Sequence, residues 1–533
     1  MPSFAELYRQ DFGDLEASAS SWRALASALA TARRDTGNSV SGPLHRAGWT
    51  GVAATAGLAA LEASESQFLT AQMNAGLIAS VVDGAAARLR AAQRTLRAVV
   101  SDAEDAGFTV SDDGRVTSRD PGGFVPEQNL ARGAAPHAGD FPSRIRAALA
   151  EALEASQEAA RLLQGLDPFA LDKRYGADQA REDALLIADY RGVSVSDIPD
   201  GTDPRQAASW WAQLSVEDRL LYLAAWPERV GALDGLPADV RDEANRAALE
   251  RLLLAETERY ASVGTQGLPV YATLADLKRR LDHGDTNVAH QRLHLIAFDT
   301  GGDGRAVVSV GNPDGARHVA VSVPGTDNRL DNFGGQIERA EVLQAAALKR
   351  YSGPHHDVSV IAWLGYDAPE FQGGRNLLDG GVITQGRAHD SAERLRDFTA
   401  GVRVANHDGD PHLTVLGHSY GSTMVGRADR GGGGLGADDV IALGSPGLSV
   451  DKAEQLRTPE ARVWVGAAPD DFVSNHLSGK TLGEDPKHPD FGARRIYVDT
   501  SGHSGYWAEG SQSLDNQGLI ITGQKPLKGD GRP

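Results

Sequence analysis

Apolar residues recur at helical spacing through the first part of the chain. From Phe4 to about Leu166, Ala, Leu, Arg and Glu dominate and follow an i, i+3, i+4 rhythm. The rhythm is interrupted near residues 37–51 and again near 107–140. We therefore predict an all-α first domain over residues 1–166.

Two shorter features accompany these helices. Within the second interruption, apolar residues alternate around an Asp113–Gly114 turn, which predicts a small β-hairpin. Residues Asp120 to Asp140 are expected to form a loop. A further helical stretch follows, and we assign residues 167–289 to a helical connecting segment that packs on the next domain.

After His290 the pattern changes to short Val/Ile/Leu runs separated by Gly-rich turns and amphipathic stretches. This alternation is typical of a mostly parallel sheet with crossover helices. We predict an α/β domain over residues 290–533 with an eight-stranded sheet. The predicted strands are 293–299, 306–310, 318–323, 358–363, 413–416, 440–443, 462–465 and 495–498.

Charge and composition narrow the function. The formal net charge of -19 opposes binding to nucleic acid, which depends on Lys and Arg. The chain has no cysteine, which excludes disulfides, thiolate metal sites and a cysteine nucleophile. Neither a signal peptide nor an apolar run of the ~20 residues that span a bilayer is found. We expect no transmembrane segment, and no metal or cofactor, since the Asp299 loop lacks the oxygen ligands of a calcium site.

The sharpest local signal is the run L-T-V-L-G-H-S-Y-G, in which an apolar strand meets G-x-S-x-G and then a helix. Such an elbow holds a serine in a strained turn above the end of a sheet. Gly417 and Gly421 leave room for close backbone approach there, and His418 lies between them beside the serine. Ser419 is therefore the candidate nucleophile.

A serine nucleophile needs an imidazole to accept its proton and a carboxylate to orient that imidazole. In a strand–elbow–helix enzyme the chain order is serine, acid, histidine. Asp470 and Asp471 follow one predicted strand, and His503 follows the last one. His476 and His488 lie in a polar stretch that no strand precedes, so we choose His503 as the base.

The charge that develops on a substrate carbonyl requires preorganised N–H donors. The residue after the nucleophile and the loop after an early strand usually supply them. These would be Tyr420, together with Thr326 and Gly325 in the run V-S-V-P-G-T-D-N. Without Ser419, that run would be read as an ordinary turn.

Several motifs together resemble an actinobacterial family of α/β-hydrolases. They are P-G-T at 324–326, W-L-G-Y-D-A-P at 363–369, G-H-S-Y-G-S at 417–422 and G-S-P-G at 444–447, with L-D-G-L-P-A at 233–238 and A-N-R at 244–246 upstream. The resemblance covers roughly residues 210–523. It implies an α/β-hydrolase fold and a triad of Ser419, Asp471 and His503. Asp471 is preferred to Asp470 because the family's acid precedes a segment like Phe472-Val473.

The N-terminal part resembles the helical hairpins of type VII secretion substrates, which carry Trp-x-Gly in the turn between two helices. Trp49-Thr50-Gly51 fits this pattern, with helices expected at Phe4–Arg34 and Val52–Leu77. A bundle in which Trp49 is only a core residue is the alternative. The spacing of a C-terminal export tail occurs at Tyr366, which instead belongs to a hydrolase motif.

These observations favour a serine esterase or lipase-like enzyme acting on a small-molecule or lipid-like ester. The alternative is an exported effector or an interaction protein, in which the hydrolase domain mainly binds a partner. Type VII machinery would then be a partner. We expect the protein to be cytoplasmic or to be exported by a type VII-like route.

Overall fold

The computed structural model describes residues 3–119, 140–166, 177–263, 268–286, 288–370, 386–479 and 482–527. The loop expected at Asp120 to Asp140 therefore lies outside the described residues except for Asp140. The chain divides into a first unit of Met1–Arg34, Glu62–Val195 and Leu214–Ala225, and a second unit of Asp35–Leu61, Ser196–Gln213 and Trp226–Pro533. The domain ranges 1–166, 167–289 and 290–533 stay a prediction.

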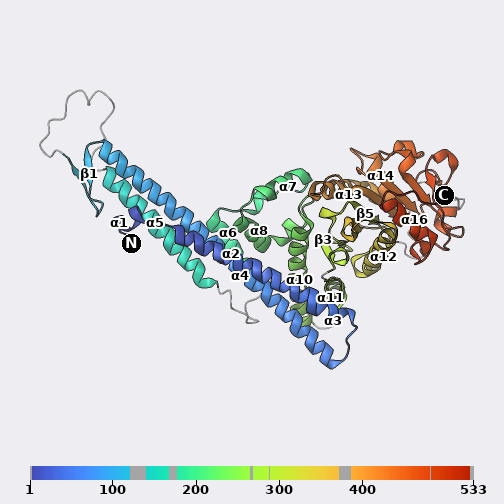
Figure 1. The fold of residues 1–533 in the computed structure, drawn as a ribbon, viewed down its shortest axis with the longest axis horizontal. Helices are drawn as coiled ribbons and strands as arrows, with labels where there is room; N and C mark the ends of the chain where they lie inside the picture. The colour runs from blue at the N-terminus through green and yellow to red at the C-terminus, as the bar shows by residue number, and fades with distance from the viewer. Residues whose placement is uncertain are drawn as a thin grey trace, which may run out of the picture. The chain divides into compact units, whose positions relative to one another are not determined.

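The first unit is built mainly of helices, as the apolar spacing predicted. Its helices are α1 (Phe4–Arg9), α2 (Gly13–Thr36), α4 (Val52–Asp105), α5 (Asp140–Gly165), α6 (Ala177–Arg191) and α8 (Val216–Ala225), of which α2 and α4 continue into the second unit. Figure 1 shows α4 as one long helix. It spans 54 residues, whereas we expected it to end at Leu77. The sequence of α4 contains no proline, which would interrupt a helix. Gly76 and Gly84 lie inside the helix, where they contact the side chains of Leu220 and Tyr190.

Alanines pack among larger apolar residues in the core of the first unit. Ala148 and Ala152 of α5 are buried in one cluster with Leu96 and Val99 of α4. Alanines at helical spacing let two backbones approach closely. A two-stranded antiparallel hairpin, β1 (Phe108–Val110) and β2 (Val116–Ser118), adds to the same cluster through its partly buried residues.

The second unit contains an eight-stranded sheet in the order β10-β9-β8-β7-β5-β6-β4-β3. The pairs among β5 to β10 are parallel, while β4 pairs antiparallel with both β3 and β6. The predicted mostly parallel α/β sheet is therefore confirmed. Its strands are β3 (Leu293–Asp299), β4 (Arg305–Val310), β5 (His318–Val323), β6 (Val358–Leu364), β7 (His412–His418), β8 (Asp439–Leu443), β9 (Val463–Gly466) and β10 (Arg494–Arg495).

The predicted strands agree with the observed ones except at the end of the chain. We expected the last strand at 495–498, but β10 covers only Arg494–Arg495. Ile496 still donates its N–H to Val465 of β9. Tyr497 donates instead to the carbonyl of Leu527, so the chain leaves the edge of the sheet there.

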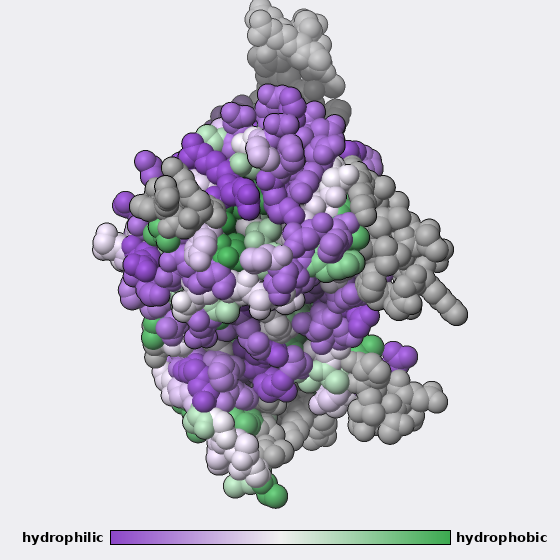
Figure 2. Space-filling model, turned by 90° about the vertical axis from the view of Figure 1, so that its right-hand side faces the viewer, coloured by the Kyte–Doolittle hydropathy of each residue, from purple (hydrophilic) through white to green (hydrophobic). Residues whose placement is uncertain are grey.

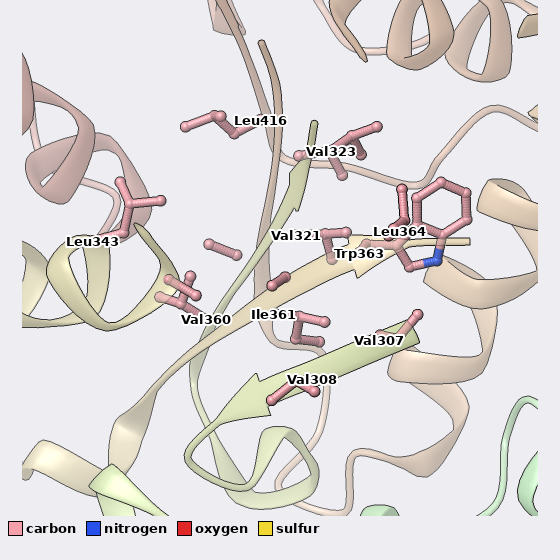
Figure 3. Close-up of a cluster of buried hydrophobic side chains, with 14 of the residues drawn as sticks. Val307, Val308, Val321, Val323, Leu343, Val360, Ile361, Trp363, Leu364 and Leu416 are labelled. Atoms are coloured by element: carbon pink, nitrogen blue, oxygen red, sulfur yellow. The ribbon is translucent and has the colours of Figure 1, made fainter. Parts of the chain in front are cut away.

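Helices cover the sheet in two groups. Helix α12 (Gly334–Arg350) packs with α16 (Gln512–Ile521), and α13 (Gly386–Ala405) packs with α14 (Tyr420–Arg430), on opposite sides of the strands (Figure 1). Between these layers the strands bury branched side chains. Figure 3 shows valines of β4, β5 and β6 gathered there, with Leu343 of α12 facing them.

Further helices complete the second unit. They are α3 (Gly42–Arg46), α7 (Pro204–Gln213), α9 (Pro227–Gly231), α10 (Ala238–Val263), α11 (Leu268–His283) and the short α15 (Phe472–His476), with a π-helical turn at Gly37–Ser41 before α3. On the face drawn in Figure 2, most coloured residues are hydrophilic, and hydrophobic ones form small separate patches. In the described parts of the chain, no helix is both long and apolar enough to cross a membrane.

Candidate active site

Ser419 lies at the carboxyl end of β7, immediately before α14. Its backbone has φ 54° and ψ -130°, a conformation that costs a non-glycine residue on the order of 1–3 kcal/mol. The amide of Ser419 donates to the carbonyl of Leu443 at the end of β8, at 2.9 Å. Neighbouring strands therefore hold the residue in its strained position, which projects it beyond the end of the sheet.

The two glycines of the elbow are required by space. A Cβ on Gly417 would lie 2.5 Å from the Cα of Ser422, and one on Gly421 would lie 2.3 Å from the carbonyl oxygen of Val323. Real Cβ atoms do not approach backbone atoms this closely. The strand-to-helix turn thus depends on glycine at both positions.

Asp471 and His503 meet at the same edge of the sheet. His503 Nδ1 lies 2.9 Å from Asp471 Oδ1, and the Asp471 side chain is fully buried. The hydroxyl of Tyr506 donates to the other carboxylate oxygen, and the amide of Val473 donates to Oδ1 at 2.9 Å. Burial acts to raise the pKa of Asp471, but the hydrogen bonds from His503 and Tyr506 outweigh it and lower the pKa to about 2. Asp471 is therefore ionised at neutral pH.

The other candidates lie elsewhere. Asp470 is exposed, and its carboxylate accepts the backbone N–H of Gly502 at 2.7 Å, so it contacts the histidine loop but not the imidazole. His476 is exposed and packs its ring on Phe472. His488 is also exposed, and its Nδ1 accepts the amide of Asp490.

The loop after β5 runs beside the serine. A Cβ on Gly325 would lie 2.7 Å from the Cβ of Ser419, so only glycine fits there. The hydroxyl of Tyr366 donates to the carbonyl of Pro324 at 2.6 Å, and Asn328 Nδ2 donates to that of Gly325 at 3.0 Å. In a trans peptide the N–H points opposite to the carbonyl. The N–H groups of Gly325 and Thr326 therefore point away from Tyr366 and Asn328.

Tyr420 is the first residue of α14. The first N–H groups of a helix have no acceptor within the helix, so the amide of Tyr420 points out of the amino end of α14. The serine, this amide and the loop after β5 thus lie together at the carboxyl edge of the sheet. The arrangement can pair a nucleophile with N–H donors.

Comparisons with known proteins agree with this geometry. A family model described as alpha/beta hydrolase matches residues 299–479. A protein of Mycobacterium tuberculosis, uncharacterized protein Rv0963c, is 34% identical over 228 residues, which cover 41% of this chain and 77% of that protein. The chain belongs to the α/β-hydrolase family.

A longer relative extends the similarity. Uncharacterized protein Rv2079 of Mycobacterium tuberculosis is 30% identical over 375 residues, or 61% of this α/β-hydrolase. The alignment covers 56% of Rv2079, so this chain spans about half the length of that relative. The family model ends at residue 479, before His503, so the match itself does not include the candidate base.

His418 is a buried neighbour of the candidate base in this α/β-hydrolase. Its Nε2 lies 2.7 Å from the carbonyl oxygen of His503, so Nε2 carries the proton and donates. Burial lowers the pKa of His418 to about 3, and repulsion from the His503 ring contributes. The ring also packs at 4.7 Å from the His503 ring. His418 thus stays neutral and holds the histidine loop in place.

Several contributing residues of the hydrolase were not identified as such from the sequence. Tyr366 lies in a quoted motif, but nothing in the sequence indicated that its hydroxyl would hold the Pro324 carbonyl. Tyr506 stands three residues after His503, and this proximity was the only available signal for its contact with Asp471. Gly444 has φ 55°, and a Cβ there would lie 2.7 Å from Asp471 Oδ2 and 3.1 Å from the His503 ring. The G-S-P-G motif therefore makes room for the acid and the base.

Among the described residues, no group of three or more His, Asp or Glu side chains could hold a metal ion. The Asp299 loop, considered above for calcium, forms the turn between β3 and β4. There Asp299 accepts the amide of Gly301 and pairs with Arg305.

Proposed function

We propose that this α/β-hydrolase is a serine esterase that cleaves a carboxylic ester through an acyl-enzyme on Ser419. The observation that carries the proposal is the Asp471–His503 pair, 2.9 Å apart, at the sheet edge where Ser419 adopts φ 54°. Because Nδ1–H of His503 donates a hydrogen bond to Asp471, Nε2 of His503 is left to accept the serine proton.

The reaction follows from these roles. His503 takes the proton of Ser419 Oγ while the oxygen attacks the ester carbonyl. The N–H groups of Tyr420, and of Thr326 or Gly325, stabilise the resulting oxyanion. The intermediate collapses, and His503 returns the proton to the departing alcohol. Water then attacks the acyl-serine in the same way, releasing the acid and restoring Ser419.

The substrate class follows from the charge and the motifs. A net charge of -19 disfavours nucleic acid, so we infer a small-molecule or lipid-like ester. The contacts of Tyr366, Gly444 and Gly325 give three of the quoted motifs a physical role at the site. These contacts support the resemblance to the actinobacterial hydrolases.

Active-site labelling tests the proposal. A fluorophosphonate probe should label the wild type and not Ser419→Ala. Ser478→Ala, which changes a serine hydrogen-bonded to Ser474 outside the elbow, should label normally. A series of p-nitrophenyl esters of increasing chain length then measures the acyl preference. Labelling that persists in Ser419→Ala would assign the nucleophile elsewhere, and no labelling of the wild type would favour the partner-binding alternative.

We infer export by a type VII route as a second possibility, because of the turn at Trp49. Trp49 lies between α3 and α4 and is 41% exposed, and the adjacent Val52 is 90% exposed. An exposed apolar turn favours recognition by a partner over a role for Trp49 in the core. In a host with type VII machinery, Trp49→Ala should reduce the protein in the medium and leave the cellular amount unchanged. Equal export of both proteins would contradict this role.

A further inference from the structure

Arg339 lies on α12 with its guanidinium over an aromatic ring of the histidine loop. Its Cζ is 4.3 Å from the ring centroid of Trp507, and the side chain is half-buried. Cation–π contact of this kind orients a guanidinium without neutralising its charge. Among the described residues, its one polar contact is long, with Nη1 3.4 Å from Gln336 Oε1.

Arg339 differs from the other arginines around it. Arg329 pairs with Asp331 and Glu370, and Arg350 pairs with Asp515. Within the described part of the chain, Arg339 has no such carboxylate partner, and burial alone lowers its pKa. A guanidinium stays protonated in proteins, so this charge is retained. Holding it half-buried without an anion costs free energy that a bound anion would offset.

The charge lies next to the candidate catalytic residues. The Trp507 ring under Arg339 is itself 4.9 Å from the His418 ring, which stacks on His503. The positive charge of Arg339 also contributes to the low pKa of His418. Trp507 is 8% exposed, and among the described residues its Nε1 has no hydrogen-bond acceptor. A cation and a spare N–H donor are thus present on one side of the site.

A polar chain joins Arg339 to the loop after β5. Gln336, which contacts Arg339, donates from Nε2 to Asn328 Oδ1 at 2.6 Å. Asn328 in turn donates to the carbonyl of Gly325 beside Ser419. An anion at Arg339 would therefore lie at the end of a network that reaches the proposed oxyanion donors.

We propose that Arg339 binds an anionic group of the substrate, a carboxylate or a phosphate, so that the enzyme prefers esters carrying a negative charge near the scissile bond. The planar fork of the guanidinium matches both anions with two parallel hydrogen bonds. This inference rests on the proposed esterase function and names its substrate class. Arg339 is a specificity-determining residue, and it takes no part in the chemical step.

Two matched pairs of esters test the proposal and separate the two anions. The first pair is the 4-nitrophenyl monoester of adipic acid and its methyl-capped form. The second pair is butyryl glycerol 3-phosphate and butyryl glycerol, whose hydrolysis is measured by the acid that it releases. For at least one pair, kcat/KM should favour the anionic ester, and Arg339→Gln should reduce that preference by roughly 10- to 100-fold. The pair that responds identifies the anion.

Two further variants separate recognition from packing. Arg339→Lys keeps the charge without the fork and should restore part of the preference. Arg350→Gln removes a paired charge from the same helix and should leave the preference unchanged. If Arg339→Gln slows the charged and neutral esters equally, Arg339 only packs on Trp507 and the inference is wrong. The inference is also wrong if the wild type hydrolyses the neutral ester of each pair better than the anionic one.

Binding without turnover distinguishes this failure from a failure of the esterase proposal. Isothermal titration of Ser419→Ala should show that at least one of the two anionic esters binds, and that adding Arg339→Gln weakens its binding by a similar factor. If no ester is hydrolysed but this binding difference persists, the esterase proposal fails and the anion site stands. Binding that is indifferent to Arg339 overturns the anion site.

Discussion

The two units of the chain place their charges in different ways. In the helical unit, several ion pairs lie in solvent: Arg9 and Asp112 are 66% and 84% exposed, and Arg90 and Glu16 are 36% and 47% exposed. Its buried carboxylate, Glu217, is 5% exposed and, among the described residues, has a single arginine partner, Arg23. In the α/β unit, Asp471 is fully buried and is held by several donors. Exposed pairs contribute little to stability, whereas a buried carboxylate must be fully hydrogen-bonded.

Backbone strain follows the same division. In the described residues, the non-glycine residues with positive φ are Asp327, Ser419 and Ser449, all in the α/β unit. Two of them flank the proposed oxyanion donors. Asp327, Ser419 and the buried Asp471 therefore belong to the candidate site, as expected where a fold preorganises chemistry. Among the described residues, the helical unit has no non-glycine residue with positive φ, so substitutions in the two units should differ in kind.

The largest expected effect is on the base. His503→Ala should reduce ester turnover by about 10⁴- to 10⁶-fold, because it removes the base that accepts the serine proton. The His503 side chain is 30% exposed, so its removal leaves a small cavity and folding should persist. Steady-state kinetics and thermal melting of the wild type and His503→Ala test this prediction. A variant that no longer shows a melting transition would mean that the loop is structural.

The next effect separates two adjacent aspartates. Asp471→Asn should lower turnover by up to ~10⁴-fold. An amide can favour the wrong tautomer of His503, and it cannot balance the positive charge that forms on the imidazole when it accepts the serine proton. Asp470→Asn keeps an oxygen that can accept the Gly502 amide and should stay within a few-fold of wild type. Both variants are assayed side by side on one ester. The reverse ranking would transfer the role to Asp470.

A smaller effect concerns stability against pH. The pKa of His418 is about 3 in the folded protein and near its ordinary 6.5 when unfolded. The unfolded state therefore binds more protons between these values, so stability falls as pH drops below 6.5. The loss should be about 3 kcal/mol by pH 4. The lowered pKa of Asp471, about 2, adds its own loss only below about pH 4.

His418→Gln isolates the contribution of His418 to the pH dependence of stability, because an amide can still donate to the His503 carbonyl but does not titrate. As pH drops below 6.5, hydrogen-exchange protection of β7 and α14 should decrease in the wild type and decrease less steeply in the variant. Equal slopes for the two proteins would show that another group carries the acid sensitivity.

The sheet and the elbow could be predicted because their signals are local. β3 and β5 were predicted with their observed bounds, since buried strands are short runs of branched residues between turns. Ser419 could be identified from Gly417 and Gly421, because the turn around the serine has no space for a side chain at either position. The truncation of β10 was not predictable, because it depends on Tyr497 pairing with Leu527, a residue far along the chain.

The surroundings of the site were less accessible to sequence reasoning. The length of α4 was underestimated because the resemblance to a helical hairpin ended its second helix at Leu77, whereas the helix continues to Asp105 and side chains from α8 and α6 pack at Gly76 and Gly84. Arg339 carries no sequence signal at all. Its distinction is the lack of a carboxylate partner among the described residues, which only a folded chain reveals.

The smallest expected effect closes the comparison between the units. Arg90→Ala removes an exposed pair with Glu16 and should lower stability by less than about 1 kcal/mol, since water solvates the Glu16 carboxylate that remains. Arg246 is the matched case in the α/β unit: it is 15% exposed and binds Asp242, which is 3% exposed, and also Asp285. Arg246→Ala should cost about 3 kcal/mol or more, because it removes the guanidinium shared by two largely buried carboxylates and leaves Asp242, among the described residues, with only the longer pair to Arg292. Calorimetric melting of both variants at neutral pH measures the difference. Equal shifts would mean that the two units do not differ in how they hold their charges.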